Sequence, residues 1–429
     1  MRKITQIILL VALVVSVRQP VSAQVMLGAY LPGDGWRVEE IHRFNQVSAK
    51  PLAFVTFFTA FSHNWREQLN WQASKIYSTG AIPLVSWMPV DVDDPDRNLL
   101  PEIAAGKWDN YIDQWIDGLL SWLGSYPESK RPMILLRFGH EFNGHWYPYS
   151  GEPMLYVVAW RRIHDRFQQA GANEFVEWVW NMNHISFDNH NDVTRYYPGD
   201  HYVDWTAIDG YNWGTNHDWT NWDSFEQVFA AAYDTLVDNY PDKPILIAEF
   251  GTTEPTDVPT ARWGQHGSDV DNDEIRAEWF FDMLESVELH FPAIRGLGLF
   301  GNDKELSWSL TSESSTGLEG FNLGLQSDHY TSSFLCARIM PPDTRLPQIE
   351  SPVILSGPAN LVPRELLNPT VFSHAVSTKR PPRDVVRRAK IKSSDYRSKV
   401  RAISRQQRAS IAIKRMEVIE YPETIVGIR

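Results

Sequence analysis

Short apolar runs bounded by turn residues recur eight times along the chain, and segments with helical periodicity lie between them. Several runs, such as PMILLRF and PILIAEF, are almost uniformly apolar, as expected of parallel strands whose outer faces are covered by helices. Residues 108–123 and 156–167 repeat apolar positions with a helical period, which predicts two of the helices. The eight predicted strands span residues 25–30, 52–57, 82–87, 133–138, 175–180, 205–211, 245–250 and 294–300.

The alternation of strands and helices predicts an α/β fold, and eight strands are the number that a closed (β/α)8 barrel, or TIM barrel, needs. Residues 24–335 suit that fold with loop insertions. The alternative is an open doubly wound sheet, but no glycine-rich dinucleotide-binding motif follows an early strand. We therefore expect a TIM barrel.

The amino-terminal segment has the pattern of a secretory signal peptide. Residues 1–23 begin with Met-Arg-Lys, continue through an apolar run and end in Val-Ser-Ala. The apolar run is shorter than the roughly 20 residues that a membrane-spanning helix needs, and no second span follows. We therefore expect a protein without a transmembrane anchor that is secreted, or exported to a periplasm.

The carboxyl-terminal region differs from the barrel in composition. Residues 341–429 hold 17 Lys and Arg and 8 Asp and Glu, against 23 and 45 in residues 1–340. The prolines within residues 336–378 predict a linker. Residues 379–429 form a basic tail, which either contacts anionic cell-envelope polymers or is merely solvated. Its few, weakly periodic apolar positions favour the solvated tail.

Charge and cysteine content exclude several classes of protein. A formal net charge of −13 disfavours nucleic acid as a partner, because phosphates require a basic surface. Cys336 is the only cysteine, so no disulfide can form within the chain. The 13 histidines include no HExxH pair, and we expect neither a metal nor a cofactor. We also expect a monomer.

Two glutamates follow predicted strands at positions where TIM barrels carry their active sites. Glu141 comes after the fourth run, in MILLRFGHE, and Glu249 closes the seventh, in PILIAEFG. Strands four and seven lie roughly opposite each other, so the two carboxylates would face one another across the mouth. Retaining glycosidases need such a pair, one carboxylate as nucleophile and one as acid and then base. The alternative is that each glutamate caps a helix or pairs with a barrel arginine.

The two carboxyl groups need different environments to perform these roles. Glu141 needs a raised pKa to donate a proton, from partial desolvation and the charge of Glu249. Glu249 has to stay ionised, held by donors such as the hydroxyl of Tyr211. His140 and Arg137 lie beside the proposed acid in the sequence and are candidates to orient it or to contact substrate.

Aromatic residues are frequent at the same strand ends, where flat rings suit the C–H faces of pyranoses. The alternative is core packing, which we expect for about half of them, because tryptophan is highly buried on average. The candidate substrate-binding residues are His140, Trp146, Tyr211, Trp87, Arg137, Asn143, Trp213 and Trp308.

The sequence resembles glycoside hydrolase family 26, a set of secreted (β/α)8 enzymes that includes endo-β-1,4-mannanases. The resemblance covers roughly residues 24–334, and its most specific segments are LRFGHEFNGHWYPYSG, YYPGDHYVDWTAIDGYNWG and PILIAEFGTTE. It implies that Glu141 is the acid/base and Glu249 the nucleophile. It further implies that His140, Trp146 and Tyr211 surround the sugar at the cleavage point.

The sequence thus predicts a secreted, retaining endo-β-glycosidase whose partner is a β-linked polysaccharide, with β-1,4-mannan as first choice. The same two glutamates occur in family members that cleave β-1,3-1,4-glucan or β-1,3-xylan, so these substrates stay open. A hypothesis of another class is a carbohydrate-binding barrel without catalysis, although the retention of both carboxylates disfavours it.

Overall fold

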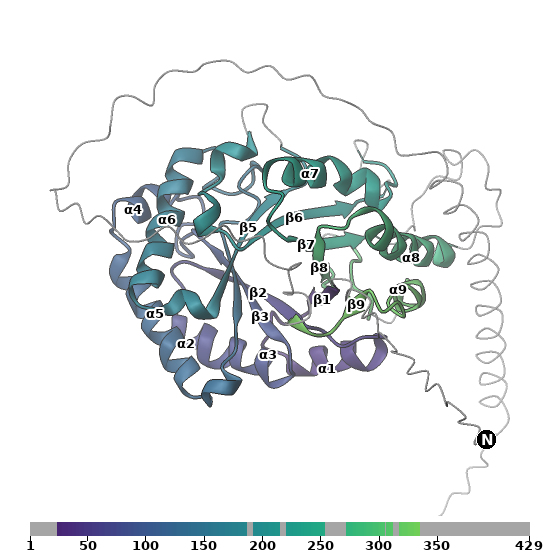
Figure 1. The fold of residues 1–429 in the computed structure, drawn as a ribbon, viewed down its shortest axis with the longest axis horizontal. Helices are drawn as coiled ribbons and strands as arrows, with labels where there is room; N and C mark the ends of the chain where they lie inside the picture. Colours follow the sequence, from purple (N-terminus) through teal and green to yellow (C-terminus); the bar gives the residue numbers. More distant parts are fainter. Residues whose placement is uncertain are drawn as a thin grey trace, which may run out of the picture. The chain divides into compact units, whose positions relative to one another are not determined.

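The computed structural model of the protein describes residues 24–186, 192–214, 220–253, 272–304, 306–311 and 317–334. The predicted signal peptide, linker and basic tail lie outside these residues. The described part forms the predicted TIM barrel, with parallel strands closed into a ring and helices around it (Figure 1).

Eight parallel strands form the barrel, because β1 pairs with β8 on one side and with β2 on the other. All eight overlap the apolar runs of the sequence. The strands are β1 (Val25–Tyr30), β2 (Phe54–Ala60), β3 (Ile82–Met88), β4 (Ile134–Phe138), β5 (Val176–Asn183), β6 (Trp205–Asn212), β7 (Ile245–Thr252) and β8 (Ile294–Phe300).

The helices cover the outside of this ring with their apolar faces (Figure 1). The two helices predicted from periodicity are present as α5 and α6, and α7 begins with a capping box between Ser224 and Gln227. The α-helices are α1 (Val38–Val47), α2 (Trp65–Glu67), α3 (Ser74–Ser78), α4 (Leu100–Ala104), α5 (Asp109–Gly124), α6 (Pro153–Gln169), α7 (Phe225–Asn239), α8 (Asn272–His290) and α9 (Leu318–Gly324).

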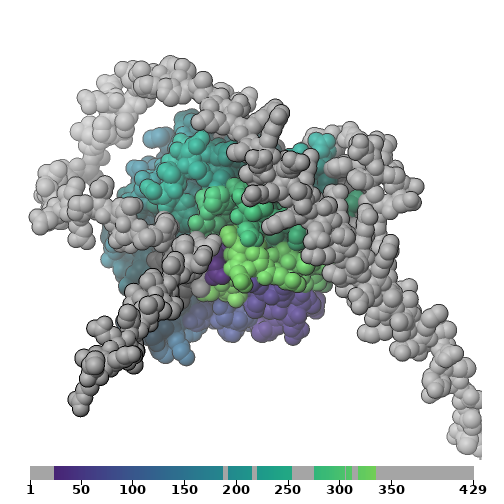
Figure 2. All heavy atoms as spheres, turned by 45° about the vertical axis from the view of Figure 1, so that its right-hand side comes forward, coloured from purple at the N-terminus to yellow at the C-terminus, as the bar shows by residue number. Residues whose placement is uncertain are grey.

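Shorter elements complete the described chain. A π-helical segment, η1 (Gln68–Ala73), joins α2 to α3, and single 3-10 turns are η2 (Glu128–Lys130), η3 (Ala172–Phe175), η4 (Val193–Tyr196) and η5 (Asp200–Tyr202). A short strand, β9 (Tyr330–Thr331), pairs with β1, so residues near 330 lie beside the start of the barrel (Figure 2). Within the described residues, the helices are too short or too polar to cross a membrane.

The interior of the barrel changes from apolar to polar along the strands. Near the strand starts, a small core that includes Phe54, Leu84 and Leu135 fills the ring. Two residues further along β3 and β4, Ser86 and Arg137 point to the same side, because side chains alternate along a strand. The polar layer thus lies at the carboxyl ends of the strands, which is where TIM barrels carry their active sites.

Candidate active site

A register shift directs Glu249 into the polar layer. Between β6 and β7, Ile208 pairs with Ile247 but the next residue, Asp209, pairs with Glu249, so Ala248 is skipped. Such an extra residue re-aims the side chain that follows it. Ala248 packs in the interior core, and Glu249 beside it also reaches inward, where Arg137 of β4 contacts it.

Arg137 is the centre of the polar layer and has no exposed surface. Its Nη2 donates to Glu249 Oε1 at 2.6 Å, and its Nη1 donates to Asp209 at 3.1 Å. It also donates from Nε to Ser86 at 2.6 Å and from Nη1 to Asn181 at 2.8 Å. The guanidinium therefore fixes the orientation of the Glu249 carboxylate from inside the barrel.

Tyr211 holds the second oxygen of the same carboxylate. Its hydroxyl donates to Glu249 Oε2 at 2.5 Å. Burial and the charge of Glu249 raise the pKa of Tyr211 well above its ordinary value, so the phenol keeps its proton. Both oxygens of Glu249 thus accept a hydrogen bond, one from a cation and one from a neutral phenol.

Glu141 lies in the turn that follows β4, with a backbone φ of 53°. Asp34 and Glu141 are the non-glycine residues with positive φ in the described part of the chain, and such strain concentrates at functional sites. The backbone N–H of Glu141 donates to the carbonyl of Asn181 at 3.0 Å, which ties the turn to β5. Gly139, with φ of 54°, provides the left-handed conformation that starts this turn.

Neutral donors hold the carboxyl group of Glu141. Asn183 Nδ2 donates to Oε1 at 2.7 Å, and Trp146 Nε1 donates to Oε2 at 2.9 Å. Burial, followed by the negative charge of Glu249, raises the pKa of Glu141 to about 7, against the smaller lowering effects of these donors and Arg137. Near neutral pH this group therefore exists both with and without its proton.

His140 lies below the mouth among aromatic rings. Its Nε2 is 2.9 Å from the Tyr147 hydroxyl, and its ring centroid is 5.5 Å from that of Phe58. Burial, and then the charge of Arg137, hold its pKa well below the ordinary value, so the imidazole is neutral. A neutral imidazole in this place adds no positive charge next to Glu141.

Three of the candidate substrate-binding aromatics keep exposed surface near the two glutamates. Trp146 is 41% exposed, while Tyr211 and Trp213 are partly buried. Trp308 is nearly buried and packs against Tyr211 and Trp213, with ring centroids 5.1 and 5.2 Å apart. Substrate contacts by these aromatics and His140 stay predictions.

Three residues predicted to contact substrate are buried, and their contacts are with protein groups. Trp87 has no exposed surface and stacks between Phe61 and Trp115 of α5, outside the ring of strands. Arg137 uses its donors on protein groups. Asn143 is buried; its amide donates to the carbonyl of Asn183 at 2.9 Å and accepts from the N–H of that residue at 2.7 Å.

Four residues that bind Arg137 or Glu141 were not predicted from the sequence. Asn183 binds Glu141, while Ser86, Asn181 and Asp209 bind Arg137. Burial and the charge of Glu249 raise the pKa of Asp209 above its ordinary value, although Arg137 opposes the rise. Their signal in the sequence is their spacing, because Asn181 and Asn183 are two residues apart at the end of a strand and so share the inner face.

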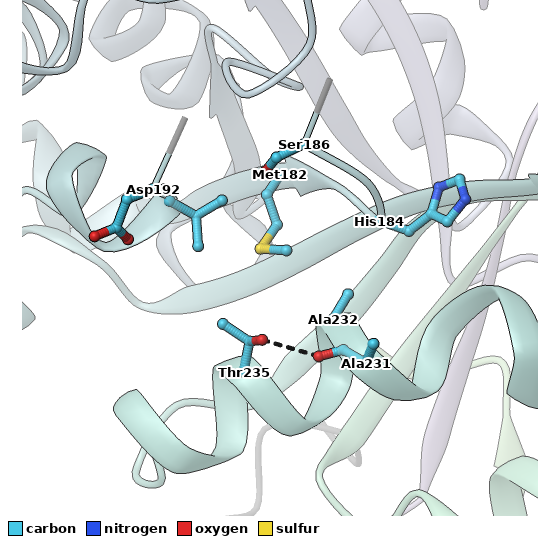
Figure 3. Close-up of a pocket in the computed structure, with 8 residues that line it drawn as sticks. Met182, His184, Ser186, Asp192, Ala231, Ala232 and Thr235 are labelled. Atoms are coloured by element: carbon cyan, nitrogen blue, oxygen red, sulfur yellow. Dashed lines mark hydrogen bonds between the residues drawn. The ribbon is translucent and has the colours of Figure 1, made fainter. Parts of the chain in front are cut away.

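A cavity of about 290 Å³ lies between the end of β5 and helix α7 (Figure 3). Met182 and His184 line one side, and Ala231, Ala232 and Thr235 of α7 line the other (Figure 3). Neither glutamate lines it, so this cavity is separate from the carboxylate pair. Within the described residues, no group of three or more His, Cys, Asp or Glu side chains is placed to hold a metal ion.

A TIM barrel with two buried glutamates at the ends of β4 and β7 has the arrangement typical of glycoside hydrolases, which use two carboxyl groups. A family model described as glycosyl hydrolase family 26 matches residues 88–278. This match and the relatives below support membership in this family.

Three known proteins show the likeness in detail. Endoglucanase H of Acetivibrio thermocellus is 31% identical over 283 residues, which are 63% of this chain and 27% of that protein. Mannan endo-1,4-beta-mannosidase A and B of Caldalkalibacillus mannanilyticus is 29% identical over 34% of this chain and 26% of that protein. The chain thus spans about a quarter of the length of these curated relatives. A modular endo-β-1,4-mannanase structure from Cellulomonas fimi shares the fold, with a TM-score of 0.54, 16% identity and 73% of each chain covered.

Proposed function

We propose that the protein is a retaining endo-β-glycosidase that hydrolyses β-1,4-mannan. The observation that carries this proposal is the unequal setting of the two glutamates. Arg137 and Tyr211 hold the carboxylate of Glu249, whereas burial and the charge of Glu249 raise the pKa of Glu141 to about 7. One group is thus suited to attack and the other to carry a proton.

In the first step, a carboxylate oxygen of Glu249 attacks the anomeric carbon of the sugar. The bond to the departing oxygen breaks, and Glu141 gives that oxygen its proton. In the second step, the ionised Glu141 takes a proton from a water molecule, whose oxygen displaces Glu249 from the sugar. This transfer restores the protonated Glu141 and the free Glu249 carboxylate, and the two displacements retain the anomeric configuration.

The test of these roles is a pair of variants, Glu249→Ala and Glu141→Ala. We expect Glu249→Ala to hydrolyse no polysaccharide detectably. Glu141→Ala should lose about 10²- to 10⁴-fold on the polymer, but much less on aryl glycosides whose nitrophenol leaving group needs no proton. Turnover like that of the wild type in either variant would reject the proposal.

Added azide separates the two roles. Azide should attack the sugar directly in Glu249→Ala, releasing an α-glycosyl azide from an aryl β-glycoside. In Glu141→Ala it should attack the covalent intermediate and release a β-glycosyl azide. The opposite assignment of products would exchange the two roles, and no azide product in either variant would contradict a covalent mechanism.

A mixed-linkage β-1,3-1,4-glucan is the second candidate substrate. The endoglucanase relative is matched over a longer part of this chain, and at slightly higher identity, than the mannosidase relative. Values of kcat/KM on mannan, galactomannan, lichenan, xylan and carboxymethylcellulose decide between the candidates. Binding without cleavage of any of them would favour a carbohydrate-binding barrel instead.

We also propose that the protein is exported, because residues 1–23 have the pattern of a signal peptide. The mass of the mature protein recovered from the producing cells tests this, since cleavage before Gln24 removes those residues. A protein that keeps Met1 in the cell would contradict export.

A further inference from the structure

Two tryptophans in the described ranges expose a large part of their surface, and only one of them belongs to the candidate active site. Trp146, 41% exposed, donates to Glu141. Trp71 is 59% exposed and lies in the π-helical segment η1, on the connection between β2 and β3. Trp71 is not among the residues described in contact with either glutamate, so the active site does not explain this exposed indole.

Trp71 is paired with a second indole. Its ring centroid is 5.8 Å from that of Trp36, and the two planes meet at 81°. Lys75 fixes Trp36, because its ammonium donates to the carbonyl of Trp36 at 2.9 Å and lies 5.6 Å from the centroid of the ring. The two indoles form a corner in which apolar faces lie beside N–H donors, which suits the C–H faces and hydroxyls of a pyranose.

The segment that carries Trp71 is anchored and has an unusual backbone. Leu69 and Ala73 have no exposed surface, and Gln72 is 4% exposed. Gln72 Nε2 donates to the carbonyl of Asp34 at 2.8 Å. Such π-helical turns are rare and are frequent at functional sites. The backbone thus holds Trp71 outward while Leu69, Gln72 and Ala73 are buried.

A chain of contacts joins this corner to the candidate active site. Asp34, which has a φ of 50°, accepts from the backbone N–H of Phe58 at 2.9 Å through its carboxylate. The ring of Phe58 packs 5.3 Å from the guanidinium of Arg137 and 5.5 Å from the ring of His140. The loop after β1, which holds both Asp34 and Trp36, therefore lies at the same end of the barrel as Glu141 and Glu249.

We propose that Trp36, Trp71 and Lys75 form a second carbohydrate-binding site on the outer rim of the barrel, which binds pyranose rings of the polysaccharide that the active site cleaves. This inference rests on the proposed function. A neutral polysaccharide is the occupant that fits, because two indoles supply apolar faces and the net charge of −13 disfavours an anionic polymer. The site would keep the enzyme on its polymer between cleavage events.

The experiment compares Trp71→Ala with Met154→Ala, a matched control whose side chain is 67% exposed on α6. Retention in native gels that contain soluble galactomannan or lichenan measures binding, in the inactive Glu249→Ala background of the full chain. Kinetics on the polymer and on an aryl glycoside are measured with Glu249 intact. Trp71→Gln repeats the test should the alanine variant not fold, since it also removes the aromatic face.

We expect both Trp71 variants to weaken retention roughly 3- to 10-fold, the loss of one aromatic contact. The KM for the polymer should rise with kcat unchanged, while both constants for the aryl glycoside should stay the same. Met154→Ala should behave as the wild type in every assay. Retention by Trp71→Ala equal to that of the parent, or an equal loss in Met154→Ala, would overturn the site. Sedimentation velocity tests whether a second copy of the chain occupies this surface instead. If the wild type is a dimer and Trp71→Ala is a monomer with unchanged retention, the carbohydrate-binding site is rejected.

The two proposals fail in different ways. If the wild type hydrolyses a polysaccharide and Trp71→Ala matches it in every assay, only the second site is rejected. If the wild type hydrolyses no glycan and binds none, both are rejected.

Discussion

Arg137 of β4 reaches across the inside of the barrel and donates to Glu249 of β7 at 2.6 Å. The guanidinium is fully buried, and the Glu249 side chain is 7% exposed. Buried ion pairs contribute little net stability, because desolvation offsets the attraction between the charges. The pair is better explained by orientation, since together with the Tyr211 hydroxyl it fixes the position of the Glu249 carboxylate.

Replacing Arg137 by methionine should destabilise the fold by about 3–5 kcal/mol, because the carboxyl groups of Asp209 and Glu249 would stay buried without their cation. Hydrolysis should be lost with it. Urea unfolding measures the stability. The matched control is Arg162→Met, whose partly exposed pair with Asp109 should contribute about 1 kcal/mol or less. Equal losses in the two variants would contradict the role given to Arg137.

The raised pKa of Glu141 predicts a pH dependence of hydrolysis. The proton donor is the protonated form, so kcat/KM on the polymer should fall as pH rises through about 7. The charge of Glu249 is the second cause of the raised pKa, after burial. Glu249→Gln should therefore lower the pKa of Glu141, which carboxyl carbon NMR measures. An unchanged pKa would mean that burial alone sets it.

Removal of the donors to Glu141 should shift its pKa in the opposite direction to Glu249→Gln. Trp146 and Asn183 donate to its carboxylate and so favour the ionised form. Trp146→Phe removes the N–H and keeps an aromatic ring, so the pKa of Glu141 should rise. The fall of kcat/KM at alkaline pH should then occur at a higher pH. Asn183→Leu should act likewise. A shift to lower pH in either variant would show that the carboxylate is not their hydrogen-bond partner.

The strands could be predicted from the sequence because their buried apolar residues form uninterrupted runs. All eight predicted strands are present, and two, β1 and β8, have the predicted bounds. The end of β5 was missed, since the apolar run stops at Trp180 while the strand continues to Asn183. The extra residues include asparagines that point into the polar layer, so apolar runs underestimate the length of a strand whose end carries site residues.

The side chains of the site were harder to predict, because both faces of a parallel barrel strand are buried. Ser86 and Trp87 are adjacent and therefore point to opposite sides of β3. Ser86 binds Arg137 inside the barrel, which leaves Trp87 among the helices. Hydrophobicity alone does not distinguish these two faces, so the sequence does not show that the ring of Trp87 packs against Phe61 and Trp115.

This assignment yields a prediction that separates packing from binding. Trp87→Phe leaves a gap between Phe61 and Trp115 and should lower the free energy of unfolding by about 1–3 kcal/mol, with KM unchanged. Trp213→Phe, at a partly buried position near Tyr211, should instead raise KM on the polysaccharide and change stability less. Thermal unfolding and polymer kinetics on both variants test the pair. A raised KM in Trp87→Phe, in protein that is fully folded at the assay temperature, would return Trp87 to the substrate-binding surface.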